Sequence, residues 1–339
     1  MEQAIMCPQC NAPLAPHRFA RSIVCSYCGA TVQLDEASIS AELFHKAYRA
    51  WNSPASTQAS SWVSLGDSHW AIDKFLAQGE TADVFSARRA RWPTELAILK
   101  LLRDSQQADL FDNEWQAIQS LQKSEAAGAA DFITLMPQPV IHGKVTDGVY
   151  AGKRASVFRR ASGFRHTFEA VKRVYPQGVP PRASIWMWRR ILEVLSFLHA
   201  SGMVHGAVLP PHLLIQENEH GVRLVSYGVA GRMGEKLRRV SAGCEAFYPA
   251  PAQSLKTLTP QLDLAMSARC IAAVLGGDPA DASVPAAVPK PLAEIIQRIA
   301  RLDPVHGATE GTWALREELG RIADTVFGTP EFIPIVMPA

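Results

Sequence analysis

The sequence predicts an α+β protein in which a small metal-binding segment precedes two unlike lobes, the first rich in strands and the second rich in helices. Three observations carry this prediction. Four of the 6 cysteines lie within the first 28 residues. Alternating apolar patterns typical of strands run from Trp70 to about Arg103 and resume up to about Phe158. Helical patterns dominate the rest of the chain, which at 339 residues has room for about two domains.

Composition and charge argue against several classes of protein. Hydrophobic residues make up 47% of the chain and charged residues 19%, so the sequence can bury a core and is not a disordered one. The net charge of +2 gives no global reason to expect a nucleic acid or an acidic membrane as partner. No apolar run approaches the roughly 20 residues of a membrane span. The first residues lack the pattern of a secretory signal, so we expect a cytoplasmic protein.

Two C-x2-C pairs open the chain, Cys7 with Cys10 and Cys25 with Cys28, and 14 residues separate them. This spacing is typical of a four-thiolate zinc site, because each short turn presents two sulfur atoms to one ion. Four thiolates leave no position for a substrate, so we expect a structural zinc ribbon over residues 1–34. Two redox-active dithiols are the alternative. The shortness of the segment favours the metal, because so few residues bury little core without one.

Residues 35–69 are predicted to form a helical linker. Apolar residues recur at helical spacing from Ile39 to Trp51 and give that helix one apolar face. The residues from Asn52 to Ser68 are rich in Ser and Ala, as many linkers are.

The two lobes follow at residues 70–160 and 161–328. A helix expected from Gln106 to Gln122 interrupts the strands of the first lobe. The tail at 329–339 is apolar but is broken by prolines, which excludes a helix. We expect the tail to lie extended along the second lobe, and a strap that binds a partner is the alternative.

Several short motifs occur in one particular order along the two lobes. They are Gly79-Glu-Thr-Ala82-Asp-Val84, Ala97-Ile98-Leu99-Lys100, Asn113-Glu114, His205-Gly206-Ala207, Ser226-Tyr227-Gly228 and Ala250-Pro251-Ala252. Their order and spacing resemble those of the eukaryotic-type Ser/Thr protein kinases from about Trp70 to Phe327. The resemblance implies a bilobal protein-kinase-like fold, with a β-rich small lobe and a helical large lobe.

The motifs of the small lobe match the family's nucleotide-binding residues in part. Only the middle glycine of the family's G-x-G-x-x-G loop is present, as Gly79. Lys100 matches the lysine that holds phosphates and Glu114 matches its helix partner, so these three are the candidate nucleotide-binding residues. Ile98 replaces a small alanine and is expected to crowd the base pocket. The resemblance therefore gives weak support for ATP as a cofactor, and a structural role for the Lys100–Glu114 pair is the alternative.

The resemblance does not extend to the catalytic and metal-binding residues of the family. In the alignment with the family's H-R-D-L-K-P-x-N pattern, Ala207 replaces the base aspartate, Leu209 the lysine and His212 the magnesium-binding asparagine. Ser226 replaces the magnesium-binding aspartate of D-F-G. A positioned general base contributes about 10² to 10⁴ in rate, and phosphoryl transfer also depends on the metal ions. We therefore expect neither Mg²⁺ in the cleft nor ordinary kinase activity.

The structural residues of the family are better preserved. The positions that stack in the family into a spine joining both lobes are occupied by Ile118, His205, Tyr227 and Asp263. The aspartate is expected to hold the backbone of the catalytic loop. A buried glutamate–arginine pair of the family is replaced by Ala252 and Gly307. Losing one partner would cost about 3 to 5 kcal/mol, whereas losing both is often nearly neutral.

Ten basic residues and a single acid, Glu169, lie between Lys153 and Arg190. Further basic residues lie from Arg232 to Arg239, the segment that corresponds to the family's activation loop. Together they predict a basic face that binds an acidic protein partner. A solvated face without a partner is the alternative, nucleic acid is a less favoured partner, and no membrane is expected.

These observations predict a catalytically inactive protein-kinase-like protein, a pseudokinase, that serves as a scaffold or a regulatory protein-interaction module. The first alternative is a sensor that binds nucleotide without metal through Gly79 and Lys100. The less favoured alternatives are an atypical phosphoryl or nucleotidyl transferase and a nucleic-acid-binding adaptor.

Overall fold

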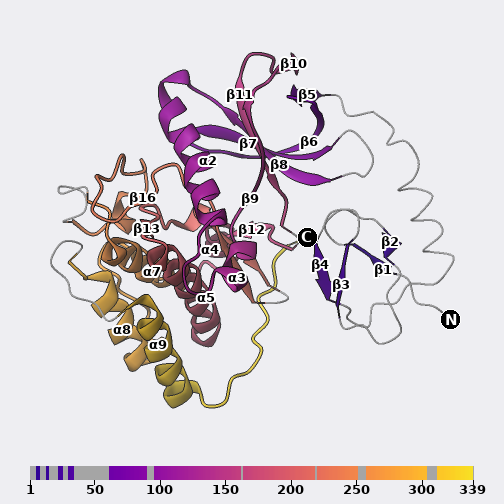
Figure 1. Ribbon diagram of the computed structural model, residues 1–339. Coiled ribbons are helices and arrows are strands. Elements are labelled where there is room, and N and C mark those ends of the chain that lie inside the picture. The colour runs from indigo at the N-terminus through magenta and orange to yellow at the C-terminus, as the bar shows by residue number, and fades with distance from the viewer. Residues whose placement is uncertain are drawn as a thin grey trace, which may run out of the picture. The chain divides into compact units, whose positions relative to one another are not determined.

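The computed structural model describes residues 5–7, 13–14, 22–25, 30–33, 61–89, 95–161, 163–217, 220–250, 257–303 and 311–338. The chain divides into two compact units (Figure 1). The first consists of Met1–Phe111 and Gln138–Ser162, and the second of Asp112–Pro137 and Gly163–Ala339. The helix expected from Ile39 to Trp51, and the positions of Ala252 and Gly307, lie outside the described residues.

Two short β-hairpins begin the first unit. β1 (Ile5–Met6) pairs antiparallel with β2 (Pro13–Leu14), and β3 (Ser22–Val24) pairs antiparallel with β4 (Thr31–Gln33). Cys7 directly follows β1 and Cys25 directly follows β3, so each hairpin turn starts with the first cysteine of a C-x2-C pair. The backbone N–H of Cys25 donates to the carbonyl of Ala30 over 2.8 Å and closes the second turn.

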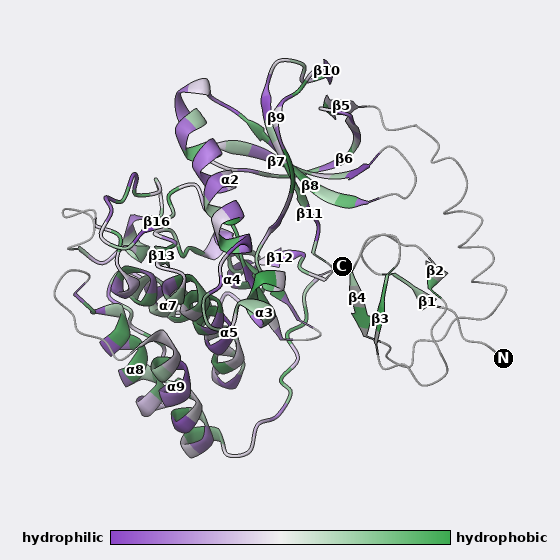
Figure 2. Cartoon of the chain, viewed as in Figure 1, coloured by the Kyte–Doolittle hydropathy of each residue, from purple (hydrophilic) through white to green (hydrophobic). Residues whose placement is uncertain are grey.

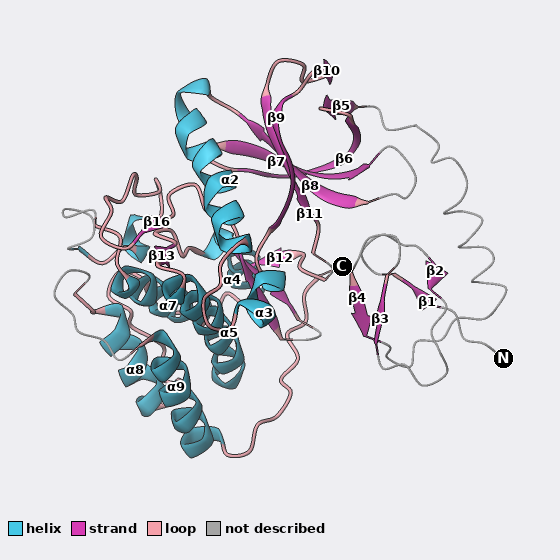
Figure 3. Ribbon diagram, viewed as in Figure 1, coloured by secondary structure: helices cyan, strands magenta, loops and turns pink. Residues whose placement is uncertain are grey.

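A seven-stranded antiparallel sheet is the largest element of the first unit (Figure 3). Its strands lie in the order β10-β5-β6-β7-β8-β11-β9. Apolar side chains that alternate along the strands, among them Trp70, Leu99 and Val157, form a fully buried core. The strands are β5 (Trp62–Leu65), β6 (Ser68–Gln78), β7 (Ala82–Arg89), β8 (Leu96–Leu102), β9 (Gln138–Lys144), β10 (Asp147–Gly148) and β11 (Arg154–Arg159).

The sheet begins earlier in the chain than the sequence predicts. β5 lies within residues 35–69, which we expected to be a linker, and it buries Val63, Ser64 and Leu65. A tight turn at Gly66, whose φ of +52° is left-handed, returns the chain into β6. Four residues are too short an apolar pattern to stand out beside a stretch rich in Ser and Ala.

Helices dominate the second unit, as the sequence predicts. α5 (Pro181–Ala200) packs against α7 (Pro260–Val274) and α9 (Thr312–Phe327), and α8 (Lys290–Ala300) packs against α7 and α9 (Figure 1). α7 is buried along its whole length after the first turn. α8 and α9 carry hydrophilic and hydrophobic residues on different faces, as amphipathic surface helices do (Figure 2). Among the described residues, no helix has both the length and the apolar character needed to cross a bilayer.

Threonine caps start two helices of the second unit. The hydroxyl of Thr167 accepts the N–H of Ala170 over 3.1 Å at the start of α4 (Phe168–Val174). The hydroxyl of Thr259 accepts the N–H of Leu262 over 3.3 Å at the start of α7. Each cap satisfies a backbone donor that the helix itself leaves unpaired.

Short strands position the loops of the second unit. β12 (His166–Thr167), β14 (Leu213–Gln216) and β15 (Gly221–Leu224) form one small sheet, and β13 (Met203–Val204) pairs with β16 (Gly231–Arg232). The unit also contains α3 (Ala129–Phe132) and the 3-10 helices η2 (Ile133–Leu135), η3 (Pro210–His212) and η4 (Glu245–Phe247). A further 3-10 helix, η1 (Ser105–Gln107), belongs to the first unit.

The boundary between the two units falls within the helix α2 (Ala108–Gln122), which differs from the predicted lobe boundary. The sequence predicts a first lobe that is continuous over residues 70–160, but Asp112–Pro137 group with the second unit. Their contacts explain this difference. Asn113 and Glu114 hydrogen-bond to the backbone of residues 227–230, and the Oγ atoms of Ser124 and Ser201 lie 2.8 Å apart. Pairing between residues so distant in the sequence leaves no local pattern.

The C-terminal tail lies extended along the second unit, as the sequence predicts. Residues 328–338 form no helix or strand. The hydroxyl of Tyr175 accepts the backbone N–H of Val336 over 2.9 Å. The ring of His220 stacks on Phe332 with 4.1 Å between centroids, and the side chain of Ile335 is buried.

Candidate functional site

The loop that aligns with the family's catalytic loop lies between β13 and β14. Its residues Ala207, Val208 and Leu209 are 2%, 0% and 0% exposed. The position of the general base therefore holds a buried methyl group, which accepts no proton from a substrate.

One buried carboxylate holds the start of this loop. Asp263, in the first turn of α7, is fully buried. Its Oδ2 accepts the backbone N–H of His205 and its Oδ1 accepts the backbone N–H of Gly206, each over 2.8 Å. This confirms the prediction that the aspartate fixes the loop backbone. Oδ2 also lies 3.1 Å from Nε2 of His199, whose Nδ1 lies 2.7 Å from the hydroxyl of Thr312. The loop is thereby connected to the first turn of α9.

His205 is buried and neutral beneath the loop. Its Nδ1 accepts the N–H of Ala207 over 3.2 Å, so Nε2 carries the proton and donates to the carbonyl of Val225 over 3.2 Å. Burial lowers the pKa of His205 below its ordinary value, although the charge of Asp263 opposes this. The ring packs edge-on against Tyr227 at 4.6 Å between centroids. Three of the four residues assigned to the spine are thus joined by direct contacts.

Helix α2 is fastened to the segment that aligns with D-F-G. The amide of Asn113 donates to the carbonyls of Gly228 and Ala230 over 2.9 and 2.8 Å. The Oε1 atom of Glu114 accepts the backbone N–H of Tyr227 over 3.2 Å. The carboxylate of Glu114, predicted as a nucleotide-site residue, therefore holds a backbone group of its own unit.

Ser226 adopts a left-handed backbone conformation, with φ of +69°. This region is sparsely populated by residues other than glycine, and Asn and Asp occupy it more readily than most. The conformation is therefore one that suits the family's aspartate, whereas the side chain present is a hydroxyl that binds magnesium weakly.

His212 lies half-buried at the position of the family's magnesium-binding asparagine. Its Nδ1–H donates to the carbonyl of Ala207 over 2.9 Å. The side chain thus closes the loop on itself, and a neutral imidazole is a poor ligand for a hard ion such as Mg²⁺.

Two apolar side chains pack against the loop, one from the activation-loop segment and one from just before α7. Gly206, which aligns with the arginine of H-R-D, has φ of +71°. A Cβ atom at this position would meet Cδ2 of Leu258 at 2.7 Å and Cδ1 of Leu237 at 2.9 Å. Leu237 and Leu258 are both buried. A side chain as large as arginine is therefore excluded here.

The two other predicted nucleotide-site residues lie in the first unit. Gly79 is exposed in the β6–β7 turn, where its N–H donates to the carbonyl of Ala82 over 2.8 Å. Its own carbonyl accepts from Nη1 of Arg103 over 2.8 Å. Lys100 lies half-buried in β8, with Nζ 5.7 Å above the ring of Phe158. The N–H of Gly79 is thus already engaged within its own hairpin.

Cys7 and Cys25 come together in one small buried cluster. They are 0% and 1% exposed and pack with Leu14 and Val32. Two hairpins therefore bring one thiol of each C-x2-C pair to the same place, and such a donor set suits zinc. Cys10 and Cys28, the other two predicted ligands, lie outside the described residues.

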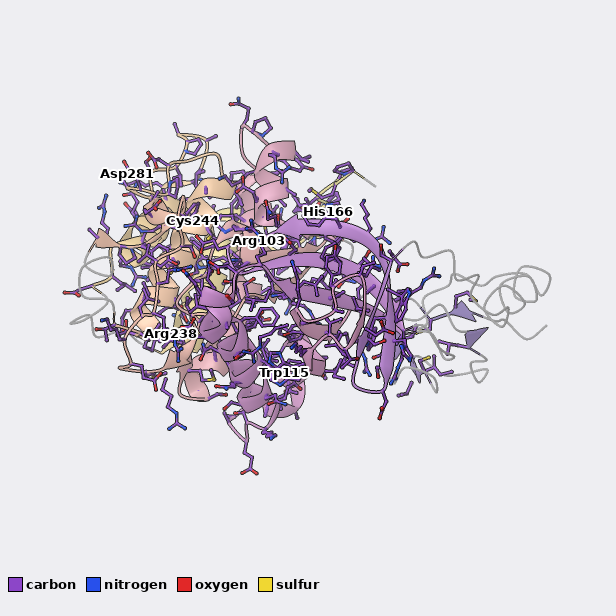
Figure 4. The ribbon with its side chains drawn as sticks, turned by 90° about the horizontal axis from the view of Figure 1, so that it is seen from above. Arg103, Trp115, His166, Arg238, Cys244 and Asp281 are labelled. Atoms are coloured by element: carbon purple, nitrogen blue, oxygen red, sulfur yellow. The ribbon has the colours of Figure 1, made fainter. Side chains whose placement is uncertain are left out.

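The basic residues between Lys153 and Arg190 are divided between the two units, and several are paired. Arg159 Nε lies 2.9 Å from Glu95 Oε1, and Arg190 Nη1 lies 2.6 Å from Glu193 Oε2. In the segment from Arg232 to Arg239, by contrast, Arg238 lies exposed at the surface (Figure 4). The segment after β16 is therefore the more accessible part of the predicted basic surface.

Sequence reasoning missed Arg269 of α7. This side chain is 8% exposed and donates to the carbonyls of four residues, Ala246, Pro279, Ala280 and Ala300. It joins η4, the loop before α8 and the end of α8. A single arginine inside an apolar helix pattern was the available signal, because such a charge needs buried partners.

One of three comparisons with known proteins, the one with solved structures, agrees with this architecture. No protein-family model matches the sequence, and no curated protein matches it. Among solved structures, the crystal structure of the BubR1 kinase domain is similar, with a TM-score of 0.58. The match is 16% identical in sequence and covers 77% of this chain and 81% of that one. A likeness at this identity shows the fold alone: the chain has a protein-kinase-like fold.

Proposed function

We propose that this chain is a pseudokinase, a kinase-fold protein without phosphoryl-transfer activity that acts as a scaffold or a regulatory protein-interaction module. The observation that carries the proposal is the burial of Ala207 at the general-base position, next to two further buried apolar residues. A missing general base lowers a rate by about 10² to 10⁴.

The surroundings of Ala207 support the same proposal. Ser226 and His212 supply a hydroxyl and an imidazole where the family has an aspartate and an asparagine for magnesium. Phosphoryl transfer depends on these ions to neutralise the developing charge. At the same time, Asp263, His205 and Tyr227 keep their mutual contacts. A scaffold that is held together while its chemistry is absent suits a binding role.

A metal-independent nucleotide sensor is the second candidate, because Lys100 is present on its strand. The turn at Gly79 weakens this candidate, since its N–H donates to Ala82 and its carbonyl accepts from Arg103. A phosphate group bound at this turn would have to compete with both hydrogen bonds.

An assay with the purified full chain tests the proposal. We expect no transfer of labelled γ-phosphate from ATP to the chain itself or to casein, with Mg²⁺ or with Mn²⁺, in conditions where an active kinase gives strong signal. Transfer that Lys100→Ala abolishes would contradict the proposal. A rise in melting temperature with ATP that persists in chelator would instead favour the sensor.

The partner we propose is an acidic protein that meets the exposed basic residues of the activation-loop segment, in the cytoplasm. The double variant Arg238→Glu with Arg239→Glu is expected to lose a partner that the intact chain captures from its native cell. Arg298→Glu, exposed on α8, is the control. Equal capture by all three proteins would exclude this surface. Nucleic acid as partner would show instead as a steep loss of affinity with salt.

We also propose a structural zinc ion bound by Cys7, Cys10, Cys25 and Cys28. The support is the shared buried cluster of Cys7 and Cys25 and the spacing of the two C-x2-C pairs. A closed four-thiolate shell would stabilise two hairpins that have little core of their own.

A further inference from the structure

A pocket of about 240 Å³ lies in the second unit between α5, α9 and the start of the C-terminal tail. Four arginines line it, together with three acidic residues. None of the lining residues belongs to the loop that aligns with the family's catalytic loop or to the basic segment from Arg232 to Arg239. The pocket therefore lies outside both parts of the chain on which the proposed function rests.

Three of the four arginines are paired within the pocket wall. Nη1 of Arg182 lies 2.8 Å from Oε2 of Glu331. Arg190 and Arg316 share the carboxylate of Glu193, at 2.6 and 2.8 Å. Because one buried carboxylate meets two guanidinium groups, this part of the wall keeps an excess of positive charge.

The fourth arginine, Arg189, has neither a hydrogen-bond nor an ion-pair partner among the described residues. Its guanidinium carbon faces Gly320 of α9, where even an added Cβ atom would lie 3.9 Å away. Burial and then the charge of Arg316 lower the pKa of Arg189; Glu193 and Asp324 act against this and Arg190 adds to it. An arginine that is partly desolvated beside other arginines is held at a cost that a bound anion would remove.

We propose that this pocket binds a small oxyanion of the phosphate class, held by Arg189 with Arg190 and Arg316 beside it. Guanidinium groups present parallel N–H donors that match the oxygen atoms of phosphate. A carboxylate offers two oxygens to the guanidinium groups around it, whereas phosphate offers more and can be reached from several sides. The volume lies below the range of about 300 to 1,000 Å³ typical of drug-sized ligands, which favours a small anion over a nucleotide.

Asp324 gives the proposal an internal test. Its carboxylate lines the pocket, is exposed, and makes no ion pair with Arg189. Its negative charge opposes an anion in the pocket, so removing the charge should strengthen anion binding. Removing the charge of Arg189 should weaken it. Opposite effects from two neighbouring substitutions are hard to explain by unfolding.

Calorimetric titration of the full chain with inorganic phosphate, at constant ionic strength, is the experiment. We expect saturable binding that Arg189→Met weakens by at least about tenfold and Asp324→Asn strengthens by about twofold or more. Arg321→Met, on the exposed surface of α9 and outside the pocket lining, should change the affinity less than about twofold. Arg189→Lys keeps the charge but not the paired N–H donors of the guanidinium. Its affinity for phosphate should therefore lie between those of the wild type and Arg189→Met.

Two further ligands, phenyl phosphate and succinate, determine which class of anion the pocket binds. Phenyl phosphate that binds as well as inorganic phosphate identifies a phosphate ester as a ligand, and phenyl phosphate that fails identifies the free ion. Succinate that binds as tightly as phosphate would overturn the phosphate class. Equal loss in Arg189→Met and Arg321→Met, or no binding of phosphate by the wild type, would overturn the site itself.

Discussion

The carboxylate of Asp263 accepts the backbone N–H of His205 over 2.8 Å, inside a fully buried environment. The second carboxylate oxygen accepts the next N–H, that of Gly206, and His199 contacts the first. The carboxylate of Asp263 therefore contacts three groups, two backbone N–H groups of the loop and the imidazole of His199 on α5. This arrangement fixes the backbone of the loop through side chains of the second unit.

Replacing Asp263 should be among the most destabilising changes in the second unit. Asp263→Ala leaves two buried N–H groups unsatisfied, and hydrogen bonds to a charged group contribute about 1.5 to 3 kcal/mol each. We expect a loss of at least about 3 kcal/mol in the free energy of unfolding, measured by urea denaturation. Glu294→Gln, on the exposed face of α8, should change it by less than about 0.5 kcal/mol. A small effect at Asp263 would mean that the loop is held by other contacts.

Stability should decrease as the pH falls below about 6.5, the ordinary pKa of histidine. Burial lowers the pKa of His205, and burial also lowers that of His220. In this window the unfolded chain binds protons that the folded chain does not, so acidification favours unfolding, and the stability is complete above the ordinary pKa.

Urea midpoints at pH 7.5 and pH 5.5 measure this dependence above the range in which most carboxylates titrate. His205→Phe keeps a ring against Tyr227 but has no proton to gain, so its midpoints should differ less than those of the wild type. An identical difference in both proteins would assign the dependence to other groups.

Arg269 should contribute to stability through its buried hydrogen bonds. Its guanidinium donates to carbonyls of three separate segments, at distances from 2.7 to 3.3 Å. Arg269→Met fills similar space but leaves those carbonyls without their donor, and we expect a loss of about 3 kcal/mol. Arg298→Met breaks only an exposed ion pair with Glu318 and should cost less than about 1 kcal/mol. Equal losses in the two variants, by urea denaturation, would contradict this role.

The sequence predicts the features that depend on local pattern or on order along the chain. The strands of the first unit from β6 onward, and the role of Asp263 in holding the loop backbone, follow in this way. The two C-x2-C pairs likewise predict that Cys7 and Cys25 approach each other.

Features that depend on packing between distant segments were not predictable. The packing against Gly206 depends on where the chain brings Leu237 and Leu258, and the burial of Ala207 likewise depends on the folded structure. The grouping of α2 with the second unit depends on hydrogen bonds from Asn113 to residues more than a hundred positions away. Arg189 has no hydrogen-bond or ion-pair partner among the described residues, and this can be seen only when the positions of its neighbours on α5 and α9 are known. None of these leaves a periodic or compositional trace.

Removing the proposed zinc should affect the hairpins and leave the helical unit folded. We expect about one zinc ion per chain by elemental analysis, lost in Cys7→Ser. Cys244→Ser, a half-buried cysteine of the second unit, should keep the metal. Because α5, α7 and α9 have a core of their own, the helical circular dichroism of the chelated protein should change little. A protein that carries no zinc, or loses it equally in both variants, would contradict the four-cysteine assignment.

Introducing carboxylates at the two aligned positions should show how tightly the loop is packed. Ala207→Asp places a charge at a position that is 2% exposed, beside Val208 and Leu209, and should cost at least about 3 kcal/mol. Ser226→Asp puts the same charge on a half-buried residue whose φ of +69° suits aspartate, and should cost less than about 1 kcal/mol. Urea denaturation of both variants measures the contrast. If Ala207→Asp were as stable as Ser226→Asp, the loop would be open enough to hold a base, and the double variant with Mg²⁺ and ATP would be the next assay for turnover.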